Sequence, residues 1–170
     1  MENVMICKNS VGVSPAVIAG ALVNGKANYI TLLSFGGVSR NPPTVYISIN
    51  KAHYTNSGIR ENGYFSVNLP SKDLIEKTEY VGRVSGRDSD KSEVFSAFYG
   101  SVDKAPMIEE CPVNILCKVI NLIDLPRNEV FIGEIVETYV AKEFVIDGRP
   151  DLQGINPLLL AGGGYYELGT

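Results

Sequence analysis

The chain has 170 residues, of which 45% are hydrophobic and 20% are charged, and its formal net charge at pH 7 is −4. This length predicts one domain, over residues 1–170, with a core that needs no disulfide or metal. The acidic balance, without any block of basic residues, argues against nucleic acid or an anionic membrane as the main partner. The first ten residues show no signal-peptide pattern, and no apolar run is long enough to span a bilayer. We therefore expect a cytoplasmic protein.

Residues that could carry metal or hydrolytic chemistry are few and scattered. The three cysteines, Cys7, Cys111 and Cys117, form no pair at zinc spacing, and their odd number is typical of reduced thiols. His53 is the single histidine, and no nucleophile-elbow motif accompanies it. We therefore expect no metal site, and we assign no residue as catalytic acid, base or nucleophile.

The N-terminal part of the chain predicts short strands separated by turns. Two strands, Val17–Val23 and Lys26–Leu33, are joined by Asn24-Gly25, a pair that tolerates the positive φ angles of a two-residue hairpin turn. A third strand, Val45–Asn50, follows Pro42-Pro43, because proline can start a strand but not lie inside one.

A helix is predicted next, over Thr55–Asn62, with Thr55 as its N-cap and Gly63 just beyond its end. The strand Tyr64–Leu69 follows, and its alternation predicts that Phe65, Val67 and Leu69 lie on one face.

The C-terminal half continues this pattern of strands and turns. Ser71 is expected to cap a second helix over Lys72–Val84, and Glu93–Ala97 to form a helical turn. Further strands are expected over Val113–Ile123, Glu129–Lys142 and Glu143–Val145, with a turn at Asp147-Gly148. This pattern predicts a mainly β protein with short helices, either a barrel or a sandwich.

The start of the Thr55–Asn62 helix combines several features of a phosphate site. The backbone N–H groups of its first turn, including that of Asn56, have no helical partner, and the helix dipole contributes about 0.3–1 kcal/mol for an anion there. Lys51 and His53 precede the helix, and an imidazole near a phosphate tends to stay protonated. The structural alternative is that Thr55 only caps the helix and that the lysine and histidine are solvated.

Several motifs occur in an order that is characteristic of one family. They are Asn28-x-x-Thr31, Pro42-Pro43 followed by VYISI, Gly63-Tyr64-Phe65-x-Val67-Asn68, Ser85-Gly86-Arg87-Asp88-x-Asp90-Lys91, and Phe131-x-Gly133-Glu134. In these motifs the chain resembles the flavin reductase-like family of FMN-binding split barrels, and within it the flavoredoxin-like branch. The resemblance implies a six-stranded Greek-key split β-barrel that forms a homodimer, with FMN near the subunit interface.

The resemblance also implies which residues bind the cofactor. Asn28, Thr31, Ser34 and Phe35 match the strand and loop beside the flavin ring and ribityl chain, where amide and hydroxyl groups could tune the flavin. Ser48 and Asn50 lie two apart on one strand face and could meet the ribityl hydroxyls.

At the two ends of the flavin, the resemblance implies two further contacts. Lys91 matches a family position that reaches the phosphate. Tyr166 matches a region where the family often places an aromatic near the cofactor, although packing at a dimer interface or over the barrel is the alternative for Tyr165 and Tyr166.

One departure from the family pattern concerns the electron donor. Many flavin reductases carry a Gly-Asp-His run on the nicotinamide side of the site, whereas residues 126–131 of this chain contain no histidine and place Glu129 there. FMN binding is unaffected by this difference, but direct oxidation of NADH or NADPH is put in doubt.

Three functions are therefore compatible with the sequence. The first is a flavin reductase that takes electrons transiently from NADPH or NADH. The second is an FMN-containing electron-transfer protein that is reduced by a redox protein partner. The third is a non-redox protein that binds another phosphate-bearing ligand.

Overall fold

The fold is known from a computed structural model, which describes residues 4–5 and 12–168. Its main element is a seven-stranded antiparallel sheet with the strand order β3-β2-β6-β9-β10-β5-β4. The strands are β2 (Val17–Val23), β3 (Lys26–Leu32), β4 (Phe35–Arg40), β5 (Pro43–Asn50), β6 (Tyr64–Leu69), β9 (Val113–Asp124) and β10 (Asn128–Val140). The thiol expected at Cys7 lies outside the described residues.

The sheet has one strand more than the six that the resemblance implied. Residues 35–40, for which no strand was predicted, form β4 and pair with β5. The β2–β3 hairpin is confirmed, because Asn24 and Gly25 have φ angles of 52° and 76°. The mainly β fold class predicted from the sequence is thus confirmed.

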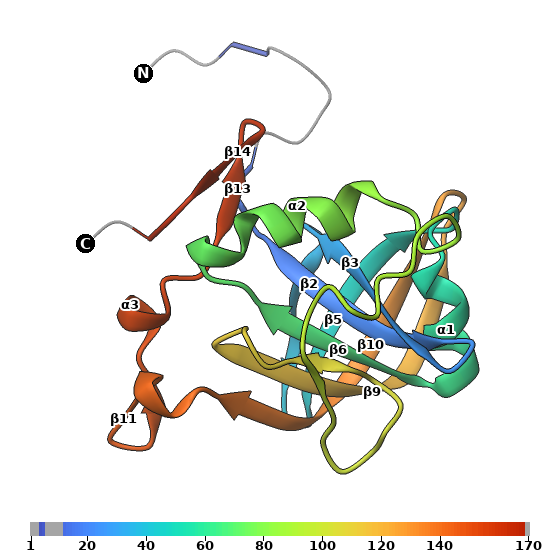
Figure 1. The fold of residues 1–170 in the computed structure, drawn as a ribbon. Helices are drawn as coiled ribbons and strands as arrows, with labels where there is room; N and C mark the ends of the chain where they lie inside the picture. The colour runs from blue at the N-terminus through green and yellow to red at the C-terminus, as the bar shows by residue number, and fades with distance from the viewer. Residues whose placement is uncertain (1–3, 6–11, 169–170) are drawn as a thin grey trace.

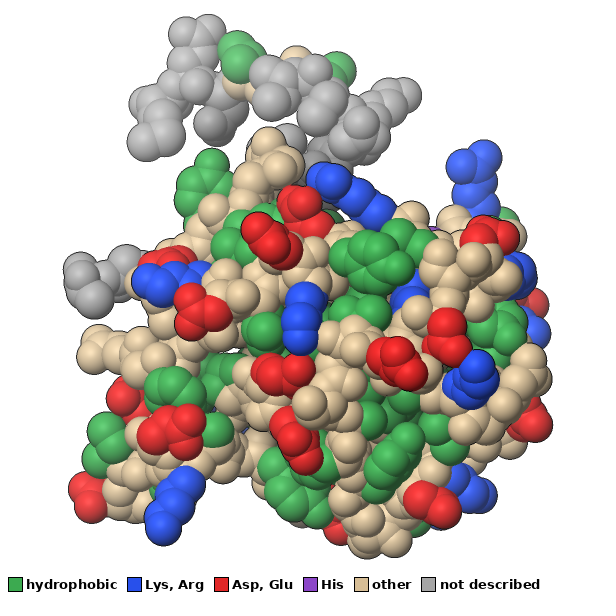
Figure 2. Space-filling view, viewed as in Figure 1, with side chains coloured by type: hydrophobic (Ala, Val, Ile, Leu, Met, Phe, Trp, Pro, Cys, Tyr) green, Lys and Arg blue, Asp and Glu red, His purple; other side chains and the backbone are tan. Residues whose placement is uncertain are grey.

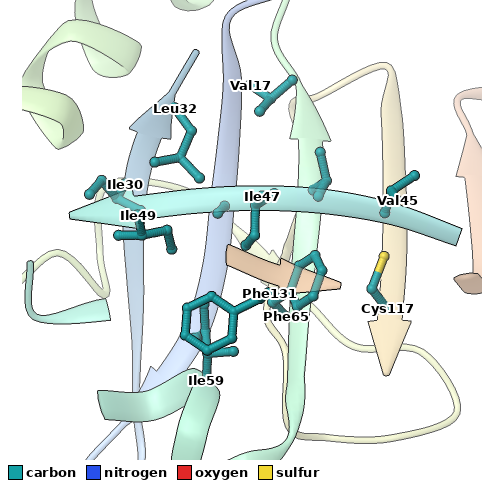
Figure 3. Packing of buried hydrophobic residues seen from close by; sticks show 13 residues of the cluster. Val17, Ile30, Leu32, Val45, Ile47, Ile49, Ile59, Phe65, Cys117 and Phe131 are labelled. Atoms are coloured by element: carbon teal, nitrogen blue, oxygen red, sulfur yellow. The ribbon is translucent and has the colours of Figure 1, made fainter. Parts of the chain in front are cut away.

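The sheet coils into an open barrel around one hydrophobic core. Its two edge strands are β3 and β4, and the N–H of Ser48 on β5 donates to the carbonyl of Ser34 at 2.9 Å, which extends the β4–β5 pairing by one residue. Side chains from β2, β3, β5, β6, β9, β10 and α1 gather in the interior, as Figure 3 shows. The cluster comprises Val17, Ala19, Ala21, Ile30, Leu32, Val45, Ile47, Ile49, Ile59, Phe65, Val67, Cys117 and Phe131. Leu69 packs against it, so the predicted face of β6 is confirmed.

Helix α1 (Thr55–Asn62) lies against one end of this barrel, where Ile59 enters the core. A Cβ atom at Gly58 would lie 2.0 Å from the carbonyl oxygen of Leu22, so only glycine allows this close approach to β2. The helix ends as expected at Gly63, which has a left-handed φ of 70°. The predicted N-cap is wrong: Tyr54 occupies that position without a side-chain cap hydrogen bond, and Thr55 is the first helical residue.

A second helical segment covers the outer face of β2 and β3 (Figure 1). It consists of a 3-10 turn, η1 (Lys72–Leu74), followed by α2 (Ile75–Arg83), which confirms the predicted helix. Ser71 precedes this segment, but its side chain makes no cap hydrogen bond. The helical turn expected at Glu93–Ala97 is wrong. Those residues form bends that lead into a small two-stranded sheet, β7 (Ala97–Phe98) with β8 (Met107–Ile108).

The C-terminal segment forms short elements beside the barrel (Figure 1). The strand expected at Glu143–Val145 begins later, because residues 142–144 form a 3-10 turn, and the Asp147-Gly148 turn is present with φ angles of 50° and 73°. The elements are η2 (Lys142–Phe144), β11 (Val145–Ile146), β12 (Arg149–Pro150), α3 (Leu152–Ile155), β13 (Leu159–Ala161) and β14 (Gly164–Tyr166), and β13 also pairs with β1 (Ser14–Pro15).

The surface carries mixed charge. On the face shown in Figure 2, acidic and basic side chains are interspersed among apolar ones, without a large area of one sign. Among the described residues, none of the helices has the length and apolarity needed to cross a membrane.

Candidate functional site

A cavity of about 360 Å³ lies between the β2–β3 turn, the start of α1 and the loop that follows α2. Its lining contains three basic residues and two acidic ones, together with amide, hydroxyl and aromatic groups. The lining residues are Val23, Asn24, Lys26, Ala27, Asn28, Tyr54, Gly86, Arg87, Asp88, Ser89, Asp90 and Lys91. Two residues predicted from the sequence, Asn28 and Lys91, therefore meet in one cavity.

Lys91 forms the buried part of this lining. Lys91 is only 4% exposed. Its ammonium group donates to the carbonyls of Tyr29 on β3 at 2.9 Å and of Val81 on α2 at 2.7 Å. No carboxylate pairs with it among the residues that the structure describes. Burial lowers the pKa of Lys91 to about 8, so the group is charged at neutral pH but without a counter-ion.

Arg87 supplies a second positive charge to the cavity. Its guanidinium donates to the carbonyl of Ala52 at 2.6 Å and lies 5.6 Å from the centre of the Tyr54 ring. Gly86 lets this loop approach β3, because a Cβ atom there would lie 2.2 Å from Oδ1 of Asn28. Arg87 and Tyr54 were not among the predicted site residues, although the Ser85–Lys91 motif contained the arginine.

Beneath the cavity, polar side chains shape the turn that leads into α1. The amide of Asn28 donates to the hydroxyl of Thr55 at 2.8 Å, so this threonine contacts β3 instead of capping its own helix. Asn56 is buried and donates to the carbonyls of Asn50 at 2.7 Å and of His53 at 3.4 Å. Asn50 in turn accepts from the N–H of Ala52 at 3.0 Å.

The two cations predicted before α1 differ in their surroundings. The ammonium of Lys51 pairs with Asp124 at the end of β9, and is thus engaged away from the cavity. His53 is exposed, and its pKa is lowered by partial desolvation and then by the charges of Lys91 and Arg87. The imidazole is therefore mostly neutral at pH 7, and an anion bound near those two cations would raise its pKa.

Other predicted site residues lie outside this cavity. Thr31 donates its hydroxyl to the carbonyl of Thr78 on α2 and lines a second cavity of about 260 Å³, which also contains Leu33 and Tyr165. Tyr166 points into neither cavity and is exposed on β14.

The predicted residues of the β4–β5 region also lie apart from both cavities. Ser34 is exposed, Phe35 packs against the barrel core, and the hydroxyl of Ser48 accepts from the amide of Asn128 at 3.1 Å.

Glu129, which stands where many flavin reductases carry histidine, faces the barrel interior. Its residue is 1% exposed, one of its oxygens pairs with Arg60 on α1, and its other oxygen has no hydrogen-bond partner among the described residues. The carboxylate thus holds α1 to β10 and is not accessible to a ligand from solvent.

The remaining candidate groups are inert. Cys111 and Cys117 are buried, and burial raises the pKa of both thiols, that of Cys117 to about 12. Within the described ranges, no three His, Cys, Asp or Glu side chains are grouped so that they could hold a metal ion.

The open antiparallel sheet, with a cation-lined cavity at the edge of β3, is that of a split-barrel protein. Residues 12–169 match the family model for the flavin reductase like domain, and the chain belongs to this family.

Three individual proteins illustrate the relationship. The crystal structure of flavoredoxin from Methanosarcina acetivorans is 41% identical, with a TM-score of 0.97 over 100% of this chain and 93% of that one. Flavoredoxin of Desulfovibrio vulgaris (Miyazaki F) is 28% identical, with a TM-score of 0.91 over 100% and 94%. A protein of Archaeoglobus fulgidus is 30% identical over 128 residues, which are 74% of this chain and 69% of that protein. The expected family and branch are thus confirmed.

The Arg60–Glu129 pair gives a test of how α1 is held. Replacing Arg60 by Met should lower the free energy of unfolding by about 1–3 kcal/mol, because a buried carboxylate loses its partner while the arginine itself is half exposed. Urea denaturation of the two proteins measures the loss.

Arg83→Met is the matched control, because Arg83 is 77% exposed and pairs with Glu79 one turn away on α2. That change should cost less than about 0.5 kcal/mol. Equal losses in the two variants would contradict the role given to Glu129.

Proposed function

We propose that this protein is an FMN-binding redox protein of the flavin reductase type. The observation that carries the proposal is the buried ammonium of Lys91, which no carboxylate of the described residues pairs with and which lines a cavity on a flavin reductase-like fold. Two flavoredoxins are similar to the chain over its whole length, which supports a flavin as the ligand. Bound flavin would supply the electron chemistry, and the chain would bind and orient it.

The charge of the cavity favours a flavin that carries a phosphate. A phosphomonoester has a charge of about −1.5 to −2 at pH 7. Lys91 lies at the base of the cavity and Arg87 at its side, and Asn28 adds an amide group between them. A phosphate placed there would give Lys91 the counter-ion that it lacks.

The remainder of the flavin would extend toward Thr31 along the free edge of β3, from which side chains of both strand faces can be reached. Asn28 and Thr31 are three residues apart, which corresponds to roughly 10 Å along a strand. The second cavity, with Thr31, Leu33 and Tyr165, lies at that end of β3. In this arrangement the hydroxyl of Thr31 and the ring of Tyr165 would face the isoalloxazine end of the ligand.

A second candidate is an electron-transfer protein that takes electrons from a redox protein and not from a nicotinamide. The burial of Glu129 favours it, because the position that carries a histidine in many flavin reductases offers no accessible side chain here.

Whether NADPH or NADH reduces the bound flavin can be tested directly. Protein purified with FMN should show visible flavin bands, and anaerobic addition of NADPH or NADH should bleach them if the protein is a flavin reductase. Bands that persist with both nucleotides but bleach with dithionite would support the electron carrier. A protein that takes up no FMN would contradict both functions.

Lys91→Met tests the phosphate position, because Met keeps most of the side-chain volume without the charge. FMN should bind about 10- to 100-fold more weakly to this variant, since a charge-assisted contact to the phosphate is lost. Riboflavin, which has no phosphate, should bind almost equally to both proteins. Quenching of flavin fluorescence measures the two dissociation constants.

Lys77→Met is the control for this test, because Lys77 is an exposed cation on α2 that does not line the cavity. If FMN and riboflavin lose the same factor in Lys91→Met, the phosphate lies elsewhere.

The lowered pKa of Lys91 predicts a pH dependence. FMN affinity relative to riboflavin should be highest above about pH 6, where the phosphate becomes dianionic, and below about pH 8, where half of Lys91 has lost its proton. Above pH 8 this relative affinity should fall by up to about tenfold per pH unit, because Lys91 must then take up a proton when FMN binds. Titrations from pH 6 to pH 9.5 measure this, and a fall that persists in Lys91→Met would assign it to another group.

We further propose that the protein forms a homodimer through the end of the β9–β10 hairpin. Ile120, Leu122, Ile123 and Leu125 are exposed there in succession, an arrangement typical of a surface that is covered by a partner. A second copy of the chain is the partner that this surface fits.

Sedimentation of the FMN-loaded protein tests the dimer. The wild-type chain should sediment as a dimer, and Ile123→Asp should shift it toward the monomer, because the change places a charge in the apolar contact. Ile146→Asp, at an exposed apolar residue of β11, is the control. A wild-type monomer would exclude the dimer.

A further inference from the structure

The charges of the main cavity are arranged by depth. The buried base holds Lys91, whereas Lys26, Arg87, Asp88 and Asp90 are exposed at its rim. Lys26 is bound to Asp90 by an ion pair of 2.7 Å, in which the side chains are 70% and 50% exposed. Arg87 and Lys91 are thus the two lining cations without a carboxylate partner among the described residues.

Hydrogen bonds define the positions of the two rim aspartates. Asp90 accepts from Lys26 and from the hydroxyl and N–H of Ser92, at 2.6 and 2.9 Å, and these hydrogen bonds hold its pKa well below the usual range. Asp88 is exposed, and its backbone N–H donates to the carbonyl of Ser85 at 3.1 Å, which fixes the residue on the rim.

On the basis of the proposed flavin site, we propose that Asp88 and Asp90 make it selective for a flavin with one terminal phosphate over a flavin with a pyrophosphate. The base of the cavity favours negative charge and the rim opposes it. A ligand whose charge is concentrated at the base gains from the cations there and keeps its charge away from the rim, whereas one whose charge extends to the rim meets the two carboxylates.

FMN and FAD differ in this respect although their phosphate charges are similar in sum. FMN carries its charge on one phosphate, which can lie entirely beside Lys91 and Arg87. FAD divides its charge between two linked phosphates, so one single charge would lie at the base and the other would lie closer to Asp88 and Asp90. Lys26 offers little compensation, because it is already paired with Asp90.

The test is the ratio of the dissociation constants of FAD and FMN, measured at pH 7 and low ionic strength for wild type, Asp88→Asn, Asp90→Asn and the double variant. In the double variant this ratio should fall by about tenfold, because two charges near the distal phosphate are removed. FMN affinity should change less than about threefold, and riboflavin affinity should not change. In 1 M salt the wild-type ratio should fall in the same direction, since exposed charges are screened.

Two further variants separate this effect from structural damage. Asp147→Asn removes the same charge in the β11–β12 turn and should leave the ratio unchanged, whereas Lys26→Gln frees Asp90 of its partner and should raise the ratio. The amide oxygen in Asp90→Asn can still accept from Ser92, so equal thermal stability is expected for that variant.

The outcomes distinguish this inference from the function on which it rests. A ratio that stays the same in the double variant and in high salt overturns the role of the two carboxylates, and any FAD discrimination is then steric. If FMN binds no more tightly than riboflavin to the wild-type protein, the phosphate site itself is wrong. FMN that binds more tightly than riboflavin, with a ratio that falls in the double variant, supports both.

Discussion

The hydrogen bonds from the ammonium group of Lys91 to β3 and α2 are the interaction on which the candidate site depends. Removing a charged group from water costs several kcal/mol, and two carbonyl dipoles compensate only in part, which is why the pKa of this lysine is lowered. The same two bonds join the loop that contains the lysine to the edge of the barrel and to the helix above it. The chain therefore maintains a costly cation in a fixed position, as expected where function is favoured over stability.

Around this cation the site is assembled from segments that are distant in the sequence. The Asn28–Thr55 hydrogen bond joins positions 27 residues apart, and the Lys91 bond to Tyr29 spans 62 residues. Glycine makes two of the close approaches possible, at Gly58 between α1 and β2 and at Gly86 between the loop and Asn28. Because each contact needs the barrel to be formed first, the site exists only in the folded chain.

The difference between local and long-range contacts also explains what could be predicted from the sequence. The β2–β3 turn and the end of α1 at Gly63 depend on backbone angles that a few residues determine, and both were predicted correctly. The hydrogen-bond partner of Thr55 could not be predicted. Its hydroxyl can either cap α1 or accept from Asn28, and which of the two bonds forms depends on how α1 packs against β3.

The same limit applies to the other site residues. The motif containing Lys91 indicated its place in the cavity through the family resemblance, and the resemblance also implied the split barrel. It assigned Asn28 and Thr31 to the same side of the flavin site, although residues three apart on a strand lie on opposite faces. Tyr166 is exposed on β14, and its position follows from the pairing of β14 with β13. That pairing was not predicted, because the turn between the two strands is marked in the sequence by three consecutive glycines alone.

The burial of Cys111 and Cys117 has a consequence for the chemistry of a protein that handles electrons. Oxidants attack the thiolate form, and a thiol whose pKa is raised by burial provides almost none of it at neutral pH. Both sulfurs are therefore protected from oxidation as long as they stay buried. The rate at which Cys117 reacts with a thiol reagent should consequently report how often the barrel core becomes exposed, which makes this side chain an internal probe of native-state motion.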